Sequence, residues 1–238
     1  RTLRTTGIGE SLVEERIDRP LRPLADRGLE IGYCARPGEV DMRFVARGAT
    51  AGPLIEQAVQ IAEQAVGRHI FGEGEEEMET VVVRLLRERQ RTVAVAESCT
   101  GGLLGHRITS VPGASEVFLG GWITYGNAAK ESWLGVPAQV LQAHGAVSEA
   151  TARTMATGAR RISGADYALA VTGIAGPSGG TPDKPVGTVF IALAGPDEEL
   201  SVLNPTNAWD RATFKHVTTQ QALELLRRAL LPFPGRKE

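Results

Sequence analysis

Ser98 follows a short apolar run and precedes a glycine-rich segment, an arrangement that can support nucleophilic chemistry. Residues 92–96 predict a short buried strand, and a helix is expected over about residues 101–108. A strand that passes directly into a helix presents free backbone N–H groups and the positive end of the helix dipole, which favour anions and a developing oxyanion. Ser98 is therefore a candidate nucleophile, although Ser98 or Thr100 could instead act only as the N-cap of this helix.

Lys130 is the candidate base for that serine. In Trp122-Ile-Thr-Tyr125-Gly-Asn127-Ala-Ala-Lys130, Asn127 can cap a helix whose first turn contains Lys130. The helix dipole disfavours an ammonium there, and a neutral lysine can accept a proton from a serine hydroxyl. Tyr125 would complete a Ser-Lys-Tyr set, while a solvated lysine and a rim tyrosine are the alternative interpretation. The histidines compete less well as bases, because none has a serine or carboxylate motif around it: His69, His106, His144 and His216.

Thr172 marks a third place with chemical potential. It ends an apolar run and opens a loop of small residues, 173–180, whose backbone can approach a ligand closely. Ligands of open α/β sheets bind at the carboxyl ends of the strands. We therefore expect Ser98, Tyr125 and Thr172 to converge on one crevice.

Arg211 and Cys99 each allow two interpretations. Arg211 stands at the start of the last predicted helix and could meet a phosphate or form a plain surface ion pair with Asp210. Cys99 is a rival nucleophile beside Ser98, but no neighbouring histidine or second cysteine activates it. We interpret Cys99 as a packed thiol.

The elements that precede these motifs predict a small α+β domain. They include a helix at residues 12–17, stopped by Pro20, and a last short strand at residues 68–71. The charged, glycine-containing run 72–77 then has the composition of a solvated hinge. We place a domain boundary at this run.

Strands and helices alternate after the hinge, closing with a helix predicted at residues 207–231. This alternation predicts an α/β fold: a three-layer α/β/α C-terminal domain with a mixed sheet, preceded by the small α+β domain. The expected domains are residues 1–72 and residues 75–238.

The composition excludes several classes of protein. Hydrophobic residues make up 42% of the chain and charged residues 23%, which is typical of a globular protein. A formal net charge of −2 does not indicate a nucleic-acid partner, and the two cysteines indicate neither a disulfide framework nor a zinc site. Because the cysteines indicate no disulfide framework, a cytoplasmic location is expected. No run is long enough to span a membrane. The chain begins at Arg1 within what reads as mid-domain sequence, so we expect it to be a fragment of a longer protein.

Four motifs resemble the C-terminal domain of the CinA family, from about residue 75 to residue 231. They are Glu97-Ser-Cys-Thr-Gly-Gly102, Trp122-Ile-Thr-Tyr-Gly-Asn-Ala-Ala-Lys130, Gly145-Ala-Val-Ser148 and Val171-Thr-Gly-Ile-Ala-Gly-Pro177. The first part of the chain resembles the middle, KH-like domain of the same family. Full-length members carry an N-terminal molybdopterin-binding-like domain, associated with ADP-ribose pyrophosphatase activity, which is not seen here.

The resemblance implies a nicotinamide mononucleotide deamidase. This amidohydrolase forms nicotinic acid mononucleotide and ammonia, a step of pyridine nucleotide salvage, and the resemblance suggests a homodimer. We expect the reaction to need no metal or cofactor. It implies Ser98 as the nucleophile with Tyr125 and Lys130 as activating partners. Backbone N–H groups from Cys99, Thr100 and Gly101 would hold the oxyanion. The ribose phosphate would meet Thr172, Gly173, Ile174, Ala175, Gly176 and Arg211.

Two alternatives remain open at this point. A non-catalytic nucleotide-binding or regulatory module would use the same glycine loops only to hold phosphate, and it would not need Lys130 or Tyr125. A KH-type nucleic-acid binder would need a basic Gly-x-x-Gly loop, of which Gly7-Ile-Gly9 is a poor version.

Overall fold

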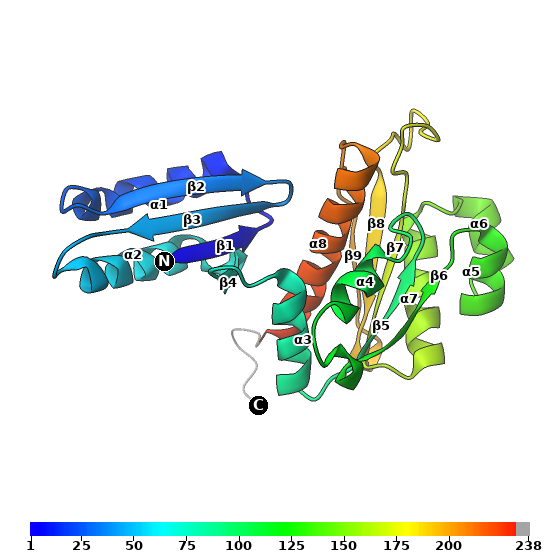
Figure 1. Cartoon of the computed structure of the whole chain (residues 1–238). Coiled ribbons are helices and arrows are strands. Elements are labelled where there is room, and N and C mark those ends of the chain that lie inside the picture. The colour runs from blue at the N-terminus through cyan, green and yellow to red at the C-terminus, as the bar shows by residue number, and fades with distance from the viewer. Residues whose placement is uncertain (232–238) are drawn as a thin grey trace. The chain divides into compact units, whose positions relative to one another are not determined.

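The computed structural model describes residues 1–231, which divide into two units between Val81 and Val82. The first unit is an antiparallel sheet in the order β2-β3-β1-β4, with two long helices packed on one of its faces (Figure 1). Its elements are β1 (Thr2–Thr6), α1 (Glu10–Ala25), β2 (Glu30–Arg36), β3 (Glu39–Val45), α2 (Ala51–Val66), η1 (Gly67–His69) and β4 (Ile70–Glu73). This antiparallel α+β arrangement confirms the fold predicted for the first part of the chain.

Two predicted boundaries in this unit are wrong. Helix α1 does not stop at Pro20 but continues through Pro20 and Pro23, because its extra turns bury Leu21 and Leu24 in the core beside the sheet. The free energy gained by burying such side chains offsets the loss of the backbone hydrogen bonds that proline removes. The last strand begins at Ile70 rather than at residue 68, because a 3-10 turn tightens the end of α2 and buries His69.

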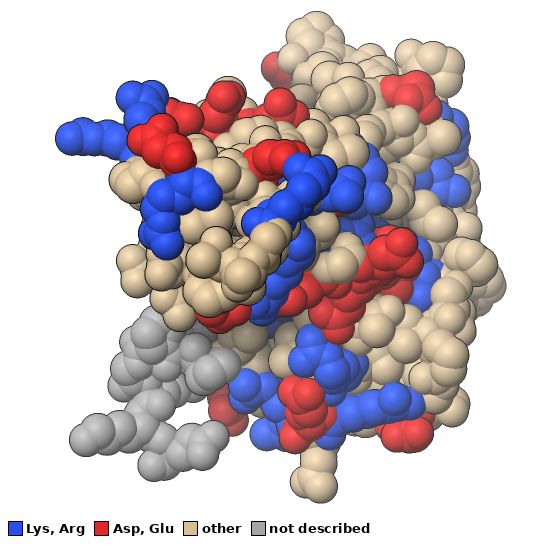
Figure 2. All heavy atoms as spheres, turned by 60° about the vertical axis from the view of Figure 1, so that its left-hand side comes forward, with Lys and Arg blue, Asp and Glu red and all other residues tan. Residues whose placement is uncertain are grey.

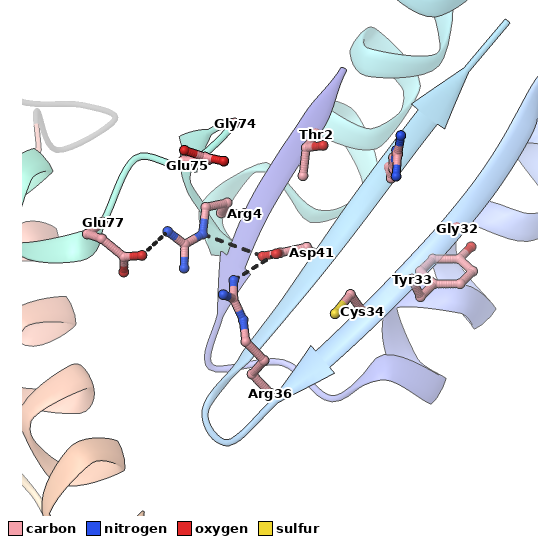
Figure 3. A pocket seen from close by; sticks show the side chains of 11 residues that line it. Thr2, Arg4, Gly32, Tyr33, Cys34, Arg36, Asp41, Gly74, Glu75 and Glu77 are labelled. Carbon is pink, nitrogen blue, oxygen red and sulfur yellow. Dashed lines mark hydrogen bonds and ion pairs between the residues drawn. The ribbon is translucent and has the colours of Figure 1, made fainter.

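The open face of the first sheet carries a hollow of about 760 Å³ (Figure 3). Arg4 lies at its base with a side chain only 2% exposed, and it forms ion pairs with Glu39 at 2.6 Å, Glu77 at 2.9 Å and Asp41 at 3.5 Å. Arg36 reaches the same Asp41 at 2.7 Å. Because these charges compensate one another, we interpret the hollow as an ion-pair network that holds β1 and β3 to residues 76 and 77.

The second unit is built on a mixed sheet in the order β6-β5-β7-β8-β9. The first three of these strands are parallel, whereas β8 and β9 run antiparallel to their neighbours. The strands are β5 (Val93–Glu97), β6 (Phe118–Ile123), β7 (Tyr167–Gly173), β8 (Val189–Ala194) and β9 (Leu200–Leu203). The predicted α/β fold with a mixed sheet is confirmed, and β5 lies buried between two parallel neighbours.

Helices cover both faces of this sheet (Figure 1). Small side chains of β5, β7 and β8 allow α7 to pack closely against one face, and α4 and α8 pack against the other. The boundary between the two units falls inside α3 (Met78–Glu88). The later helices are α4 (Leu103–Thr109), α5 (Asn127–Leu134), α6 (Ala138–His144), α7 (Glu149–Ser163) and α8 (Arg211–Leu230), with short turns η2 (Ala114–Glu116) and η3 (Pro196–Glu198). Helix α8 begins later than predicted, because Asp210 caps it and Asn207 instead bonds to Thr218 and Gln221. Residues 232–238 lie outside the described part.

Acidic and basic side chains are interspersed on the face that Figure 2 presents. Such mixing lacks the large single-sign patch that is typical of nucleic-acid-binding surfaces. Among the described residues, no helix combines the length and apolarity that a membrane span requires.

Candidate active site

Ser98 stands at the carboxyl end of β5, the strand that parallel neighbours flank on both sides. Its N–H donates to the carbonyl of Val171 at 2.9 Å, so the backbone of Ser98 is fixed to the end of β7. Only 8% of the residue is exposed. The parallel register aligns Glu97 with Ile123 and Val171, which brings the residues after all three strands to one edge of the sheet.

The helix after Ser98 starts differently from the prediction. Neither Ser98 nor Thr100 caps it: α4 begins at Leu103, and its N-cap is Gly102. Gly101 and Gly102 both have positive φ values, 60° and 98°, so the chain turns twice before the helix starts. As a result, the first N–H groups of α4 face the carboxylate of Glu97 rather than Ser98.

The predicted oxyanion donors also need a correction. The N–H of Gly101 already donates to the carbonyl of Ser98 at 3.2 Å and closes the turn. In the described part of the chain, the N–H groups of Cys99 and Thr100 donate to no backbone carbonyl, although the N–H of Cys99 lies against its own thiol. These two are the donors that the loop leaves for an anion beside Ser98.

Lys130 lies against Ser98. Its Nζ atom donates to Oγ of Ser98 at 3.1 Å, to the carbonyl of Thr124 at 2.7 Å and to the carbonyl of Tyr125 at 3.3 Å. The lysine is fully buried, and this burial lowers its pKa below the ordinary value. It belongs to the first turn of α5, which starts at Asn127 with Gly126 as N-cap.

Tyr125 directs its phenol away from the lysine. The residue is 61% exposed, and its hydroxyl accepts a hydrogen bond from Nη2 of Arg211 at 3.0 Å. Only the backbone carbonyl of Tyr125 reaches Lys130. The contact between base and serine is therefore direct, and the phenol stands with Arg211 at the rim.

Thr172 and Arg211 reach the same edge from β7 and α8. The hydroxyl of Thr172 is buried and donates to the carbonyl of Ala146 at 2.7 Å, and Nη1 of Arg211 donates to the carbonyl of Gly176 at 2.9 Å. A pocket of about 220 Å³ opens between these groups. It is lined by Ser98, Cys99, Tyr125, Lys130, Ala146, Val147, Thr172, Gly173, Ala175 and Arg211.

Four further predicted residues surround this pocket without lining it: Thr100, Gly101, Ile174 and Gly176. Gly176 takes part through its carbonyl, which accepts from Arg211. The backbone groups of Ile174 already have partners, since its N–H donates to the carbonyl of Thr188 and its carbonyl accepts from the N–H of Gly187.

Cys99 is unsuited to act as the nucleophile. Burial raises the pKa of its thiol to about 12, and the nearby Glu97 carboxylate acts in the same direction. The thiol is therefore protonated at neutral pH, and a thiol is far less nucleophilic than a thiolate.

Sequence reasoning missed residues that the structure places at the site. Ala146 and Val147 line the pocket, and Glu97 holds the helix start. Lys215 lies one turn after Arg211, and its Nζ would be 3.7 Å from a β-carbon placed on Gly101. Its position four residues after Arg211 on one helix face was the available signal.

The described residues, 1–231, contain no group of three or more His, Cys, Asp or Glu side chains placed to hold a metal ion. The groups at the pocket that can take part in chemistry include the hydroxyl of Ser98 and the buried amine of Lys130.

Two family models match this chain and together cover most of its length. The family model described as the CinA C-terminal domain matches residues 75–230, and that of the CinA KH domain matches residues 1–72. The chain belongs to the CinA family. A CinA-like protein of Akkermansia muciniphila is 45% identical over 223 residues, 94% of this chain and 52% of the relative. A CinA-like protein of Anaeromyxobacter sp. strain K is 45% identical over 224 residues, 91% of this chain and 54% of the relative.

Solved structures of CinA proteins cover about two thirds of this chain. The competence/damage inducible protein CihA of Agrobacterium tumefaciens is 37% identical with a TM-score of 0.61, covering 67% of this chain and 99% of that protein. A CinA superfamily protein of Klebsiella pneumoniae is 32% identical with a TM-score of 0.63, covering 66% of this chain and 98% of that protein. The chain itself spans about half the length of the curated CinA relatives that it matches.

Proposed function

We propose that this chain is a serine amidohydrolase that converts nicotinamide mononucleotide into nicotinic acid mononucleotide and ammonia. The proposal rests on one observation: the fully buried Nζ of Lys130 lies 3.1 Å from Oγ of Ser98. The resemblance to CinA deamidase domains supports the choice of substrate. The placement of the pocket at the carboxyl ends of the parallel strands supports a small-molecule substrate.

The surroundings of Lys130 suit a neutral amine. A neutral amine has two N–H donors and one lone pair, and two carbonyls, those of Thr124 and Tyr125, stand at 2.7 and 3.3 Å to accept the two N–H bonds. In that neutral form the lone pair would face Ser98, and the hydrogen bond between Nζ and Oγ, 3.1 Å apart, would run from the serine hydroxyl to the amine. Burial favours this neutral form, because a buried ammonium loses its hydration.

In the first step, Lys130 takes the proton of the Ser98 hydroxyl while Oγ attacks the carboxamide carbon of the substrate. The carbonyl oxygen becomes an oxyanion. The N–H groups of Cys99 and Thr100, which donate to no backbone carbonyl in the described structure, donate to it. The resulting ammonium of Lys130 keeps the two carbonyls as acceptors and gains a third N–H.

That third proton completes the step. Lys130 gives it to the amide nitrogen, and the C–N bond breaks. Ammonia leaves, and a nicotinoyl ester remains on Oγ of Ser98. Lys130 is then neutral again and takes a proton from a water molecule that attacks the ester. Collapse of the second oxyanion breaks the ester bond, and Lys130 returns its proton to Oγ of Ser98.

The pocket suits the reacting end of the substrate. At about 220 Å³ it is smaller than the roughly 300–1,000 Å³ of most sites for drug-sized ligands, so the pyridine ring lies inside and the ribose phosphate lies at the rim. Arg211 stands at that rim with a guanidinium that can donate to phosphate oxygens.

The test is ammonia release from nicotinamide mononucleotide by the parent chain, Ser98→Ala and Ser132→Ala. Ser132 is a matched control, since it is an exposed serine of α5 whose hydroxyl donates to the carbonyl of Ala128. We expect release by the parent and Ser132→Ala, and a loss of several orders of magnitude in Ser98→Ala. Binding of the mononucleotide without release by the parent would instead favour the non-catalytic binding module.

A further inference from the structure

We propose that Glu97 is the positioning residue of this site, whose buried carboxylate fixes the nucleophile loop and thereby directs the oxyanion donors. The expected effect on catalysis rests on the proposed function, whereas the fixing of the loop rests on the hydrogen bonds of the Glu97 carboxylate. Glu97 is the last residue of β5, immediately before Ser98, and it is only 1% exposed.

The carboxylate of Glu97 accepts three backbone hydrogen bonds. Its Oε2 atom accepts from Gly102 at 2.9 Å and from Leu104 at 3.1 Å, and its Oε1 atom accepts from Gly105 at 2.8 Å. A helix start leaves four N–H groups without helical partners, and one carboxylate satisfies three of them here.

The remaining N–H of these four, that of Leu103, donates to the carbonyl of Thr100 at 3.4 Å. With the N–H of Gly101 bonded to Ser98, every donor from Gly101 to Gly105 has an acceptor within the protein. The loop therefore offers an anion only the N–H groups of Cys99 and Thr100. Glu97 occupies the positive end of α4 and so separates the helix start from the oxyanion donors.

The backbone of Glu97 also connects the nucleophile to the base. Its carbonyl accepts from the N–H of Thr124 at 2.8 Å, and the carbonyl of Thr124 accepts from Lys130 at 2.7 Å. One residue thus holds the loop that carries Ser98 through its side chain and the segment that leads to Lys130 through its main chain. A carboxylate that accepts several N–H bonds is a rigid support, because charge-assisted hydrogen bonds are the stronger ones.

The experiment compares Glu97→Gln with Glu224→Gln in the whole chain. A glutamine at 97 keeps one acceptor oxygen and turns an NH₂ group toward backbone donors, so part of the network is lost. Glu224 is a matched control: its carboxylate is also buried, it bonds to Arg227 and Arg228, and it lies roughly 20 Å along α8 from Arg211 at 1.5 Å per residue.

We expect Glu97→Gln to lower kcat for ammonia release about 100-fold, with KM changed less than about 3-fold, and to speed amide exchange at Gly102, Leu104 and Gly105. Glu224→Gln should leave kcat, KM and the exchange of these three amides unchanged, even if it lowers Tm as much as Glu97→Gln does. Glu97→Gln with fast exchange at these amides but parental kcat would overturn the proposal.

Two measurements keep the proposal testable by other means. In the parent itself, the amides of Gly102, Leu104 and Gly105 should exchange more slowly than those of Cys99 and Thr100, and equal rates would contradict the carboxylate network even if Glu97→Gln did not fold. A fluorophosphonate probe, which bonds phosphorus to Oγ of Ser98 and releases fluoride, should label Glu97→Gln about 100-fold more slowly than the parent. Slow labelling of the variant together with no ammonia release by the parent would support the positioning role and reject the substrate.

Discussion

Nζ of Lys130 lies 3.1 Å from Oγ of Ser98, although 32 residues separate them in the chain. The contact is enclosed, since the lysine is fully buried and the serine is 8% exposed. A buried amine in contact with a hydroxyl is an arrangement in which a proton can move without first crossing bulk water.

The pH dependence of the reaction should follow the titration of Lys130. Burial lowers its pKa below the ordinary 10.5, and only the neutral amine can accept the proton of Ser98. The rate should therefore be low while Lys130 is an ammonium, rise as the pH passes through the lowered pKa, and level off before pH 10.5. Initial rates of ammonia release across pH give this profile.

Lys130→Met should lose about 10²–10⁴-fold in kcat and the rising limb of the profile with it. Lys184→Met serves as the control, because the amine of Lys184 donates to the carbonyl of His144 and Lys184 does not line the pocket. An unchanged rising limb in Lys130→Met would show that another group is the base.

Arg211→Gln should weaken binding of the phosphate rather than the chemical step. A charge-assisted hydrogen bond contributes about 1.5–3 kcal/mol, so KM for nicotinamide mononucleotide should rise roughly 10- to 150-fold with a smaller change in kcat. The riboside, which lacks the phosphate, should be affected little. Steady-state kinetics with both compounds test this, with Arg153→Gln, an exposed arginine paired with Glu149, as the control. Equal losses for the two compounds would place Arg211 away from the phosphate.

Cys99→Ala should keep activity within about 3-fold of the parent. The thiol is buried and its pKa is raised to about 12, so it is neither ionised nor accessible at neutral pH. Iodoacetamide should modify the exposed Cys34 first and leave ammonia release unchanged. Inactivation that tracks alkylation of Cys99, measured by mass spectrometry, would make the thiol a participant in the reaction.

Arg4→Met should destabilise the first unit. Removing one partner of a buried ion pair costs about 3–5 kcal/mol, and Glu39, whose side chain is 4% exposed, would be left without that partner. Arg22→Met removes an exposed pair with Asp18 and should change the free energy of unfolding by at most about 1 kcal/mol. Urea unfolding of the three proteins measures both differences. Equal effects of the two substitutions would argue against a structural role for the Arg4 network.

Much of the fold could be predicted because its signals are local. The apolar run before Ser98 and the alternation of strands and helices after the hinge depend on side-chain periodicity, which the sequence displays directly. The extension of α1 through Pro20 could not be predicted in this way. It depends on the burial of Leu21 and Leu24 against a core assembled from distant segments.

For the site, local rules identified residue types and the tertiary structure decided their roles. Ser98, Lys130 and Thr172 could be selected because each stands where a strand ends or a helix begins. Their meeting depends on the parallel register of β5 with β6 and β7, a non-local property. The capping rule failed at Ser98 for a related reason: two glycines with positive φ redirect the chain, so a carboxylate five residues before the N-cap receives the helix donors. The path of the backbone in space decides which hydrogen-bond partners a group can reach. That path depends on tertiary packing as well as on the neighbouring residues in the sequence.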